Sequence, residues 1–203
     1  MGDQLYSILD RPWIYALARK ILAPGMERVL TRHLREMLSS LPPGDQLLDL
    51  GCGPKSWLSY LGLRPVGLDL SPSYMKSYQY LGGSGVVATA AKVPFQDESF
   101  DGVWSIGLLH HLPDDTAHAA ITEAMRVCRP DGYVAILDAV LPRSVWERPV
   151  AAFIRRLDRG AFIRSEEAMR ALLPDSSKWK STRFTFAATG LEMLGCVLCK
   201  SSG

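Results

Sequence analysis

The segment Leu47-Leu48-Asp49-Leu50-Gly51-Cys52-Gly53-Pro54 is the most informative part of this chain. An apolar stretch runs directly into a glycine turn, and an acid precedes the first glycine. In a doubly wound sheet, a nucleotide-like cofactor lies across the strand ends at such a junction. Glycine is favoured there because a Cβ atom would hold the ligand away from the backbone and resist positive φ angles. Since Gly-x-Gly occurs in many tight turns, the segment needs support from its surroundings.

A second acidic strand end follows in Val66-Gly67-Leu68-Asp69-Leu70-Ser71, where Asp69 lies 18 residues after Gly51. An ionised carboxylate only accepts hydrogen bonds, and its two oxygens match the two hydroxyl donors of a ribose. Asp69 is therefore the expected ribose-binding residue. A helix N-cap or a turn acid is the alternative interpretation. The spacing leaves room for a helix of about two turns near residues 58–63.

Two cofactors compete for this pattern, a nicotinamide dinucleotide and S-adenosylmethionine. A dinucleotide site needs G-x-G-x-x-G at the opening of a helix, so that the pyrophosphate meets the helix N-terminus. Here Ser56 stands where the third glycine would be. Asp49 would be unfavourable beside a pyrophosphate, but it suits a cofactor that carries an ammonium and a sulfonium. The residues favour S-adenosylmethionine.

With these motifs the chain resembles a known family, the class I S-adenosylmethionine-dependent methyltransferases, particularly their small-molecule type 11 group. The resemblance rests on the two segments above and on three more, which follow in the family's order. These are Val93-Pro94-Phe95-Gln96-Asp97-Glu98-Ser99-Phe100-Asp101 running into Val103-Trp104-Ser105, then Leu109-His110-His111-Leu112-Pro113, then Arg129-Pro130-Asp131-Gly132-Tyr133-Val134. Together they span roughly residues 45–140, whereas the first 40 and last 60 residues match loosely.

The resemblance implies which residues would contact the cofactor. Residues Gly51, Cys52 and Gly53 would line its methionine part, with Asp69 on the ribose and Leu70 against the adenine. The adenine edge would meet Thr89, Ala90 and Ala91, and the pocket would be closed by Ser105, Ile106, Gly107 and Leu108. The chain departs from the family at Lys55, where a third glycine is usual, and at Thr89 and Ala91, where acids are common. These departures imply weakened cofactor affinity.

Methyl transfer needs mainly an acceptor held in line at close distance in a dry pocket. A general base is needed only where the acceptor loses a proton during attack. His110 and His111, just past the fourth expected strand, are the candidates for that base. Asp138, at the end of the fifth strand, is a candidate for orienting an amine or hydroxyl. Packing of the loop without proton chemistry is the alternative for both histidines.

The pattern of elements predicts an α/β fold: a doubly wound, mostly parallel seven-stranded sheet with an antiparallel C-terminal hairpin. Strands are expected near 46–50, 66–69, 85–88, 101–106, 133–139, 182–187 and 191–199, with helices at 72–80 and 114–128 among others. We expect one domain, 1–203, with four parts. These are an N-terminal helical cover (1–41), a cofactor-binding core (42–142), a helical lid (143–178) and a terminal hairpin (179–203).

The segments that flank the core are net basic, while residues 42–142 are net acidic. Solvated helix faces would explain this, as would an anionic substrate or a membrane surface. Val145–Gly160 is a basic amphipathic stretch, interpreted as a lid, a peripheral membrane contact or plain packing. Nucleic-acid binding is disfavoured because the basic residues form no recognisable module with exposed aromatics.

Cysteine spacing and the chain's start bear on metals and location. Cys196 and Cys199 lie in an expected strand, where positions three apart face opposite sides, so we expect core thiols and no metal. No apolar run approaches a membrane span and the start lacks a secretory pattern, which predicts a cytoplasmic protein. The oligomeric state is not indicated.

The sequence therefore predicts an S-adenosylmethionine-dependent methyltransferase acting on a small-molecule or lipid-like acceptor. The alternative is a non-catalytic relative that binds the cofactor, or a subunit that requires an activating partner. A dinucleotide oxidoreductase is a weaker third candidate.

Overall fold

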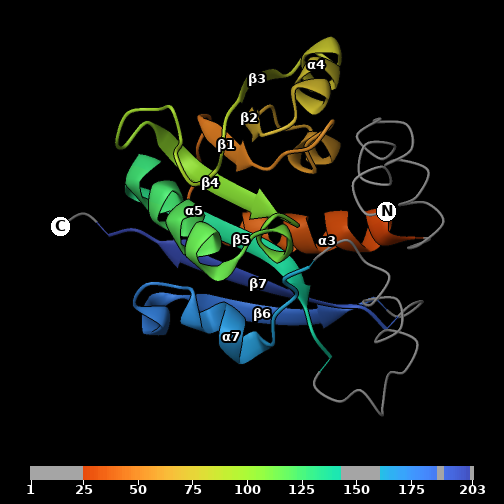
Figure 1. Ribbon diagram of the computed structural model, residues 1–203, viewed down its shortest axis with the longest axis vertical. Helices are drawn as coiled ribbons and strands as arrows, with labels where there is room; N and C mark the ends of the chain where they lie inside the picture. The colour runs from red at the N-terminus through yellow and green to blue at the C-terminus, as the bar shows by residue number, and fades with distance from the viewer. Residues whose placement is uncertain (1–24, 143–160, 187–189, 202–203) are drawn as a thin grey trace.

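A computed structural model describes residues 25–142, 161–186 and 190–201, and within them a seven-stranded sheet runs through the molecule (Figure 1). The strand order is β3-β2-β1-β4-β5-β7-β6. Strands β1 to β5 pair in parallel, and β7 is antiparallel to both β5 and β6. The strands are β1 (Leu47–Leu50), β2 (Val66–Asp69), β3 (Ser84–Val87), β4 (Phe100–Ile106), β5 (Cys128–Val140), β6 (Lys180–Thr185) and β7 (Glu192–Cys199).

Helices cover both faces of this sheet (Figure 1). They are α3 (Met26–Ser39), α4 (Pro72–Tyr80), α5 (Asp114–Val127) and α7 (Glu166–Ala171), with 3₁₀ turns η1 (Leu58–Leu61), η2 (Leu109–His111) and η3 (Ser176–Lys178). Local sequence sets their starts. The Ser71 hydroxyl accepts from the amide of Tyr74 ahead of Pro72, and Ser165 caps α7 in the same way.

The apolar core is divided by the sheet into two layers. Alternating residues of β5 point to opposite faces, as a strand requires. Ile136 belongs to the layer under α5 and α7, which also contains Trp179. Leu137 belongs to the layer under α3 and η1, which contains Trp104. The Trp104 indole donates to the Tyr133 hydroxyl at 3.1 Å, so this buried polar pair is satisfied.

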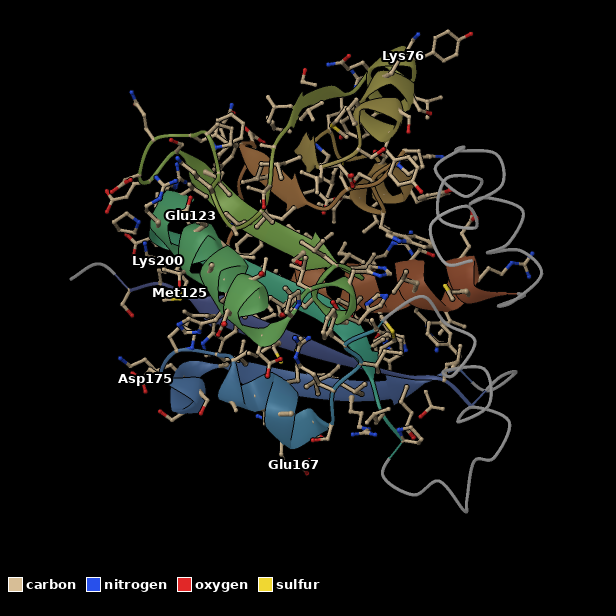
Figure 2. The ribbon with its side chains drawn as sticks, in the orientation of Figure 1. Lys76, Glu123, Met125, Glu167, Asp175 and Lys200 are labelled. Atoms are coloured by element: carbon tan, nitrogen blue, oxygen red, sulfur yellow. The ribbon has the colours of Figure 1, made fainter. Side chains whose placement is uncertain are left out.

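Polar side chains surround these layers. Figure 2 shows Lys76 on α4 at one end of the molecule, and Glu167 and Asp175 near α7 at the opposite end. Among the described residues, no helix is long and apolar enough to cross a membrane.

The structure confirms the predicted fold class, including the antiparallel pair that ends the sheet. Two elements differ from expectation. The connection after β1 contains only the 3₁₀ turn η1 in place of a two-turn helix. Strand β5 begins at Cys128 rather than near residue 133, because Cys128 already pairs with Phe100 ahead of an irregular register. Residues 1–24 of the predicted cover and 143–160 of the predicted lid, including Val145–Gly160, lie outside the described residues.

Candidate functional site

The turn after β1 contains Gly51, which is packed against Leu108, and Gly53, which has free space beside it. Gly51 and Gly53 have φ values of +69° and +64°, which L side chains rarely adopt. A Cβ atom on Gly51 would lie 2.7 Å from Cδ1 of Leu108, so this glycine is also required by close packing. A Cβ atom on Gly53 would meet none of the described residues within 4 Å. The free space therefore lies over Gly53.

The end of β2 is hydrogen-bonded to this turn. The amides of Gly51 and Cys52 both donate to the Leu68 carbonyl, at 2.7 and 3.1 Å. The Asp69 carboxylate accepts from Gly53 N at 3.0 Å and from Ser71 N at 2.9 Å. Burial raises the pKa of Asp69, and these amide donors oppose the rise. Asp69 thus lies beside the open turn, as the ribose assignment requires.

Asp49 is a buried carboxyl group, only 1% exposed, at the start of the same turn. Its Oδ2 accepts from the Ser56 hydroxyl at 2.6 Å, whereas Oδ1 has no hydrogen-bond partner among the described residues. Burial, reinforced by nearby Asp69, raises the pKa of Asp49 to about 7 against the effect of Ser56. A buried polar atom without a partner calls for a ligand or another explanation. An ammonium group would supply one.

The end of β4 closes the turn from the other side. Ser105 pairs with Leu50 in the parallel ladder, so both strand ends lie at one edge of the sheet. The Ser105 hydroxyl is a second buried group without a described hydrogen-bond partner. Ile106 is buried, and Gly107 donates to the Leu137 carbonyl at 2.8 Å. These residues and Leu108 lie where the resemblance expects the pocket to close.

The loop after β3 begins next to Asp69, whose carbonyl accepts from Ala88 N. Leu70, expected against the adenine, is 72% exposed. Thr89 is also exposed, and its hydroxyl oxygen accepts from Ala91 N at 3.3 Å, while Ala90 is buried. The loop has no acid at residues 89–91, so the usual acidic contact to an adenine amino group is missing.

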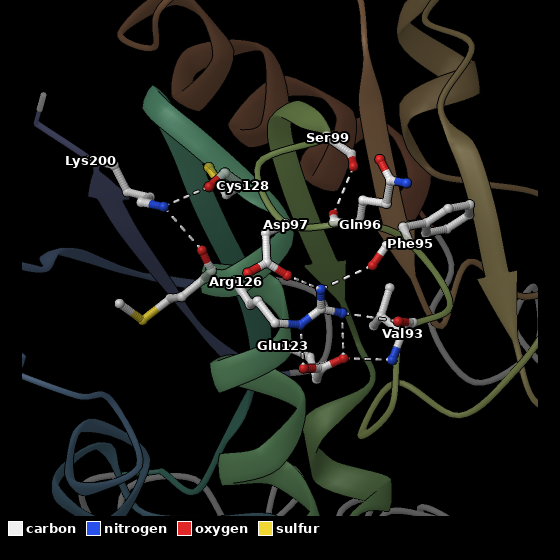
Figure 3. A network of polar contacts seen from close by, with 10 residues as sticks. Val93, Phe95, Gln96, Asp97, Ser99, Glu123, Arg126, Cys128 and Lys200 are labelled. Carbon is white, nitrogen blue, oxygen red and sulfur yellow. Dashed lines mark hydrogen bonds and ion pairs between the residues drawn. The ribbon is translucent and has the colours of Figure 1, made fainter.

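Arg126 of α5 anchors the continuation of this loop (Figure 3). Its guanidinium donates to the carbonyls of Val93 and Phe95, at 3.0 and 2.9 Å, and to the carboxylates of Glu123 and Asp97. Glu123 in turn accepts from Val93 N at 2.7 Å. Arg126 is a structural residue that the sequence did not single out. No signal near it in the sequence indicates that it reaches back some 30 residues.

The candidate catalytic residues lie in and beside η2. Nδ1 of His110 is 2.5 Å from Oδ1 of Asp138, and the rings of His110 and His111 lie 4.0 Å apart. Asp138 is 1% exposed, so its carboxylate faces His110 and the backbone. The structure therefore joins two candidates that the sequence treated separately. The orientation of an acceptor by Asp138 would have to act through His110.

Together, the residues proposed for the cofactor gather at the carboxyl ends of β1, β2 and β4. This arrangement fits S-adenosylmethionine. It consists of an open glycine turn, a carboxylate before the turn with one buried oxygen that has no described hydrogen-bond partner, and a second carboxylate at the end of β2. Asp49, Gly53 and Asp69 carry this fit.

The cysteines do not form a cluster. Cys196 is buried and Cys199 is exposed, so the two face opposite sides of β7 as predicted. The expectation of core thiols is right for Cys196 and wrong for Cys199, because the position near the end of the strand turns that side chain outward. Burial raises the pKa of the Cys52 thiol, which keeps it neutral in the turn. Across residues 25–142, 161–186 and 190–201, no three His, Cys, Asp or Glu side chains are placed to hold a metal ion.

Comparison with known proteins finds relatives of this chain. Residues 48–136 match the family described as "Methyltransferase domain". Over 168 residues the chain is 32% identical to O-methyltransferase rstn1 of Aspergillus nomiae, covering 77% of this chain and 73% of that protein. A solved structure from Thermotoga maritima, a possible histamine N-methyltransferase, has a TM-score of 0.69 at 16% identity, covering 96% and 99% of the two chains. At this identity the likeness concerns the fold alone.

Two further relatives act on different kinds of acceptor. One is 2-methyl-6-phytyl-1,4-hydroquinone methyltransferase of Synechocystis, 34% identical over 56% of this chain and 40% of that protein. The other is tRNA (carboxymethyluridine(34)-5-O)-methyltransferase of Arabidopsis thaliana, 39% identical over 49% of this chain and 25% of that protein. The chain thus spans less than half of these relatives' length.

Proposed function

Because the chain belongs to the class I S-adenosylmethionine-dependent methyltransferases, we propose that it transfers the methyl group of S-adenosylmethionine to a small-molecule acceptor. The observation that carries this proposal is the pair of carboxylates, Asp49 and Asp69, beside the open turn at Gly53. The ammonium group at the methionine end of the cofactor and the hydroxyls of its ribose both need hydrogen-bond acceptors, which Asp49 and Asp69 would provide.

The cofactor contacts are assigned from this geometry. Asp49 would hold the ammonium with its spare Oδ1 and become ionised as it does so. Asp69 would offer its oxygens to the ribose hydroxyls while it keeps the Gly53 amide. Cys52, Gly51 and Gly53 would line the methionine part. The adenine would lie between Leu70 and the loop at Thr89 and Ala90, and Ser105, Ile106 and Gly107 would form the wall toward β4.

The cofactor supplies an activated methyl group, so the chain's own work is binding, orientation and exclusion of water. Leu108 packs tightly on Gly51 and shields the turn. His110, His111 and Asp138 form the candidate acceptor side, because η2 directly follows the β4 end that would line the pocket. A near-attack alignment between acceptor and methyl group can supply much of the rate enhancement without further chemistry.

A small acceptor is supported by the relative from Synechocystis, which is named as a 2-methyl-6-phytyl-1,4-hydroquinone methyltransferase. For this chain, a lipid-like acceptor and contact with a membrane surface stay part of the proposal. The basic stretch 145–160, on which membrane contact depends, lies outside the described residues. A cytoplasmic location stays a prediction.

A second candidate function is methylation of tRNA, which the Arabidopsis relative favours. That match covers only a quarter of the relative. A third possibility is a protein that binds the cofactor without turnover or needs an activating partner. The departures at Lys55, Thr89 and Ala91 support it.

Two measurements test these functions. Isothermal titration calorimetry with S-adenosylmethionine and S-adenosylhomocysteine should show binding of both, and absence of both would refute the proposal. Transfer of a tritiated methyl group should then be measured on a small-molecule extract and, separately, on bulk tRNA. Label in the small-molecule fraction supports the proposal, label in tRNA supports the second function, and binding without any transfer supports the non-catalytic alternative.

A further inference from the structure

The connection between β1 and β2 is short, and a hollow of about 600 Å³ lies beside it. Parallel strands are usually joined by a crossover helix that packs on the sheet. Here the four-residue turn η1 takes the place of that helix. The hollow is lined by residues between Lys55 and Arg64 on one side, and between Tyr78 and Ser84, at the end of α4 and the start of β3, on the other. Both α4 and β3 lie at one end of the molecule (Figure 1).

The charged groups of this hollow are both cationic. Lys55 and Arg64 line it, and no Asp or Glu is among the described residues that do so. Neither base forms an ion pair with another residue in the described part of the chain. An anion that entered the hollow would therefore meet two positive charges without displacing a carboxylate from either of them.

Lys55 is held at the hollow by an aromatic ring. Its Nζ lies 3.8 Å from the centroid of the Tyr60 ring, which is a cation–π contact. The contact keeps the ammonium group beside η1, where Tyr60 lies. Lys55 is also the residue at which the glycine turn departs from the family pattern, and the cofactor assignment gives it no role. Its place in the lining of the hollow offers one.

Tyr78 joins the two walls of the hollow. The residue is 3% exposed, and its hydroxyl donates to the Pro65 carbonyl at 2.8 Å. Burial raises the pKa of this phenol, and a hydrogen bond with the Ser59 side chain opposes the rise. On the other wall the ring packs against Gly83, where a Cβ atom would lie only 2.3 Å from Cε1. The two walls are therefore held at a fixed separation.

Both walls leave their backbone uncovered. The second wall contains the glycine-rich stretch Gly82-Gly83-Ser84-Gly85, in which Ser84 adds an exposed hydroxyl. Gly62 on the first wall and Gly82 on the second have φ values of +82° and +84°. A Cβ atom on either would lie more than 4 Å from every described group other than its chain neighbours. Glycine-rich backbone beside a basic side chain is a common setting for phosphate groups.

We propose that this hollow binds a small phosphorylated molecule, with Lys55 and Arg64 as the cationic partners of its phosphate oxygens. Arginine engages a phosphate through two N–H donors and lysine as a point charge. The volume exceeds what one phosphate needs and falls in the range of small-molecule sites, about 300–1,000 Å³. A diphosphate or a nucleotide is therefore the expected size.

This site is separate from the proposed cofactor site. Arg64 and Ser84 lie at the amino ends of β2 and β3, whereas the proposed cofactor residues gather at the carboxyl ends of the strands. A polynucleotide is a less suitable occupant, because its binding depends on many bases along the backbone and the described lining contains only two. The inference does not depend on methyl transfer.

The test compares Lys55→Gln, Arg64→Gln and the double variant with Lys76→Gln as the matched control. Lys76 is an exposed lysine of α4 that does not line the hollow (Figure 2). Inorganic pyrophosphate, uridine diphosphate and bulk tRNA are each titrated by calorimetry at low ionic strength, where screening is weak. Saturating S-adenosylhomocysteine is present throughout, so that the proposed cofactor site is not available to the added ligands. Thermal unfolding shows whether each variant is folded.

We expect saturable binding of uridine diphosphate or pyrophosphate at one site, with NMR shifts at the amides of Gly62 and Gly82. Each single substitution should raise the Kd roughly three- to tenfold, between the usual effects of exposed ion pairs and of well-formed bonds to charged groups. The double variant should bind neither compound measurably. Lys76→Gln should leave the Kd unchanged.

Three results would overturn the proposal. They are no saturable binding of either small compound, an equal loss of affinity in Lys76→Gln and Arg64→Gln, and binding of tRNA alone, which would assign the bases to RNA. If Lys55→Gln does not fold, Arg64→Gln and the glycine shifts decide the question. A parent protein that binds no S-adenosylhomocysteine would refute the proposed function and leave the test of the hollow intact.

Discussion

Oδ2 of Asp69 accepts a hydrogen bond from the backbone amide of Gly53 at 3.0 Å, so the end of β2 holds the turn that follows β1. The geometry of the turn and the proposed ribose contact therefore depend on one carboxylate. A ribose at this place would meet an acceptor that is already fixed in orientation.

Removal of this carboxylate should weaken cofactor binding. A hydrogen bond to a charged group contributes about 1.5–3 kcal/mol, so Asp69→Ala should raise the cofactor Kd roughly tenfold or more in calorimetry. Asp115→Ala, which removes an exposed acid from the first turn of α5, serves as the control. An unchanged Kd in Asp69→Ala would refute the ribose assignment.

Gly53→Ala and Gly62→Ala form a matched pair. Both glycines have positive φ, +64° and +82°, and a Cβ atom on either would lie more than 4 Å from every other group in the described part of the chain. Each substitution should lower the free energy of unfolding by about 1 kcal/mol, since an alanine tolerates this backbone region poorly. Only Gly53→Ala should also weaken cofactor binding, because its methyl group enters the proposed site. Urea unfolding measures the stabilities and calorimetry the cofactor affinities. If Gly53→Ala and Gly62→Ala bind the cofactor equally well, the space over Gly53 is not used by the cofactor.

Asp49→Asn should make the protein more stable and bind its cofactor less well. The folded-state pKa of about 7 lies above the ordinary 3.8. The stability that this group contributes is therefore present below pH 3.8 and lost as pH rises through 7. The neutral asparagine avoids that loss, so the variant's advantage should grow between pH 4 and 7, to at most about 4 kcal/mol.

Urea unfolding of Asp49→Asn and the parent at pH 5 and pH 8 measures that advantage. Calorimetry in the same buffers should show that the parent's cofactor affinity falls below pH 7, where Asp49 takes up a proton. The variant's affinity should be low and independent of pH. A parent affinity that is flat from pH 5 to 8 would argue against the Asp49–ammonium contact.

Arg126→Ala should loosen the loop that leads from β3 to β4. The guanidinium donates to the Val93 and Phe95 carbonyls, and no other donor among the described residues bonds to them. We expect a loss of about 1–3 kcal/mol in the free energy of unfolding and a several-fold rise in cofactor Kd. Hydrogen exchange at residues 89–95 should increase, and protection equal to the parent's would contradict the anchoring role.

The sequence was sufficient for the fold because chemically distinctive residues mark the strand ends. Gly51 and Gly53 end β1, Asp69 ends β2, and Ser71-Pro72 starts α4 at the expected residue. The length of η1 was not predictable, because Ser56 turns inward to Asp49 and only the structure shows that contact.

The candidate site was predictable as a set of residues but not as pairs. His110 and Asp138 are 28 residues apart on different elements, and neither position indicates the other. Arg164 lies in the segment 143–178, which the sequence predicted only as a helical lid. Its partners are mainly backbone carbonyls, and a backbone partner cannot be identified from residue types because every residue has a carbonyl.

The division of the core by the sheet has a practical consequence. Trp104 is buried on the side of α3, and Trp179 is buried on the side of α5 and α7. Each layer therefore contains its own intrinsic fluorophore. Chains that retain one indole and carry phenylalanine at the other tryptophan positions would show by their emission whether one half of the interior melts before the other.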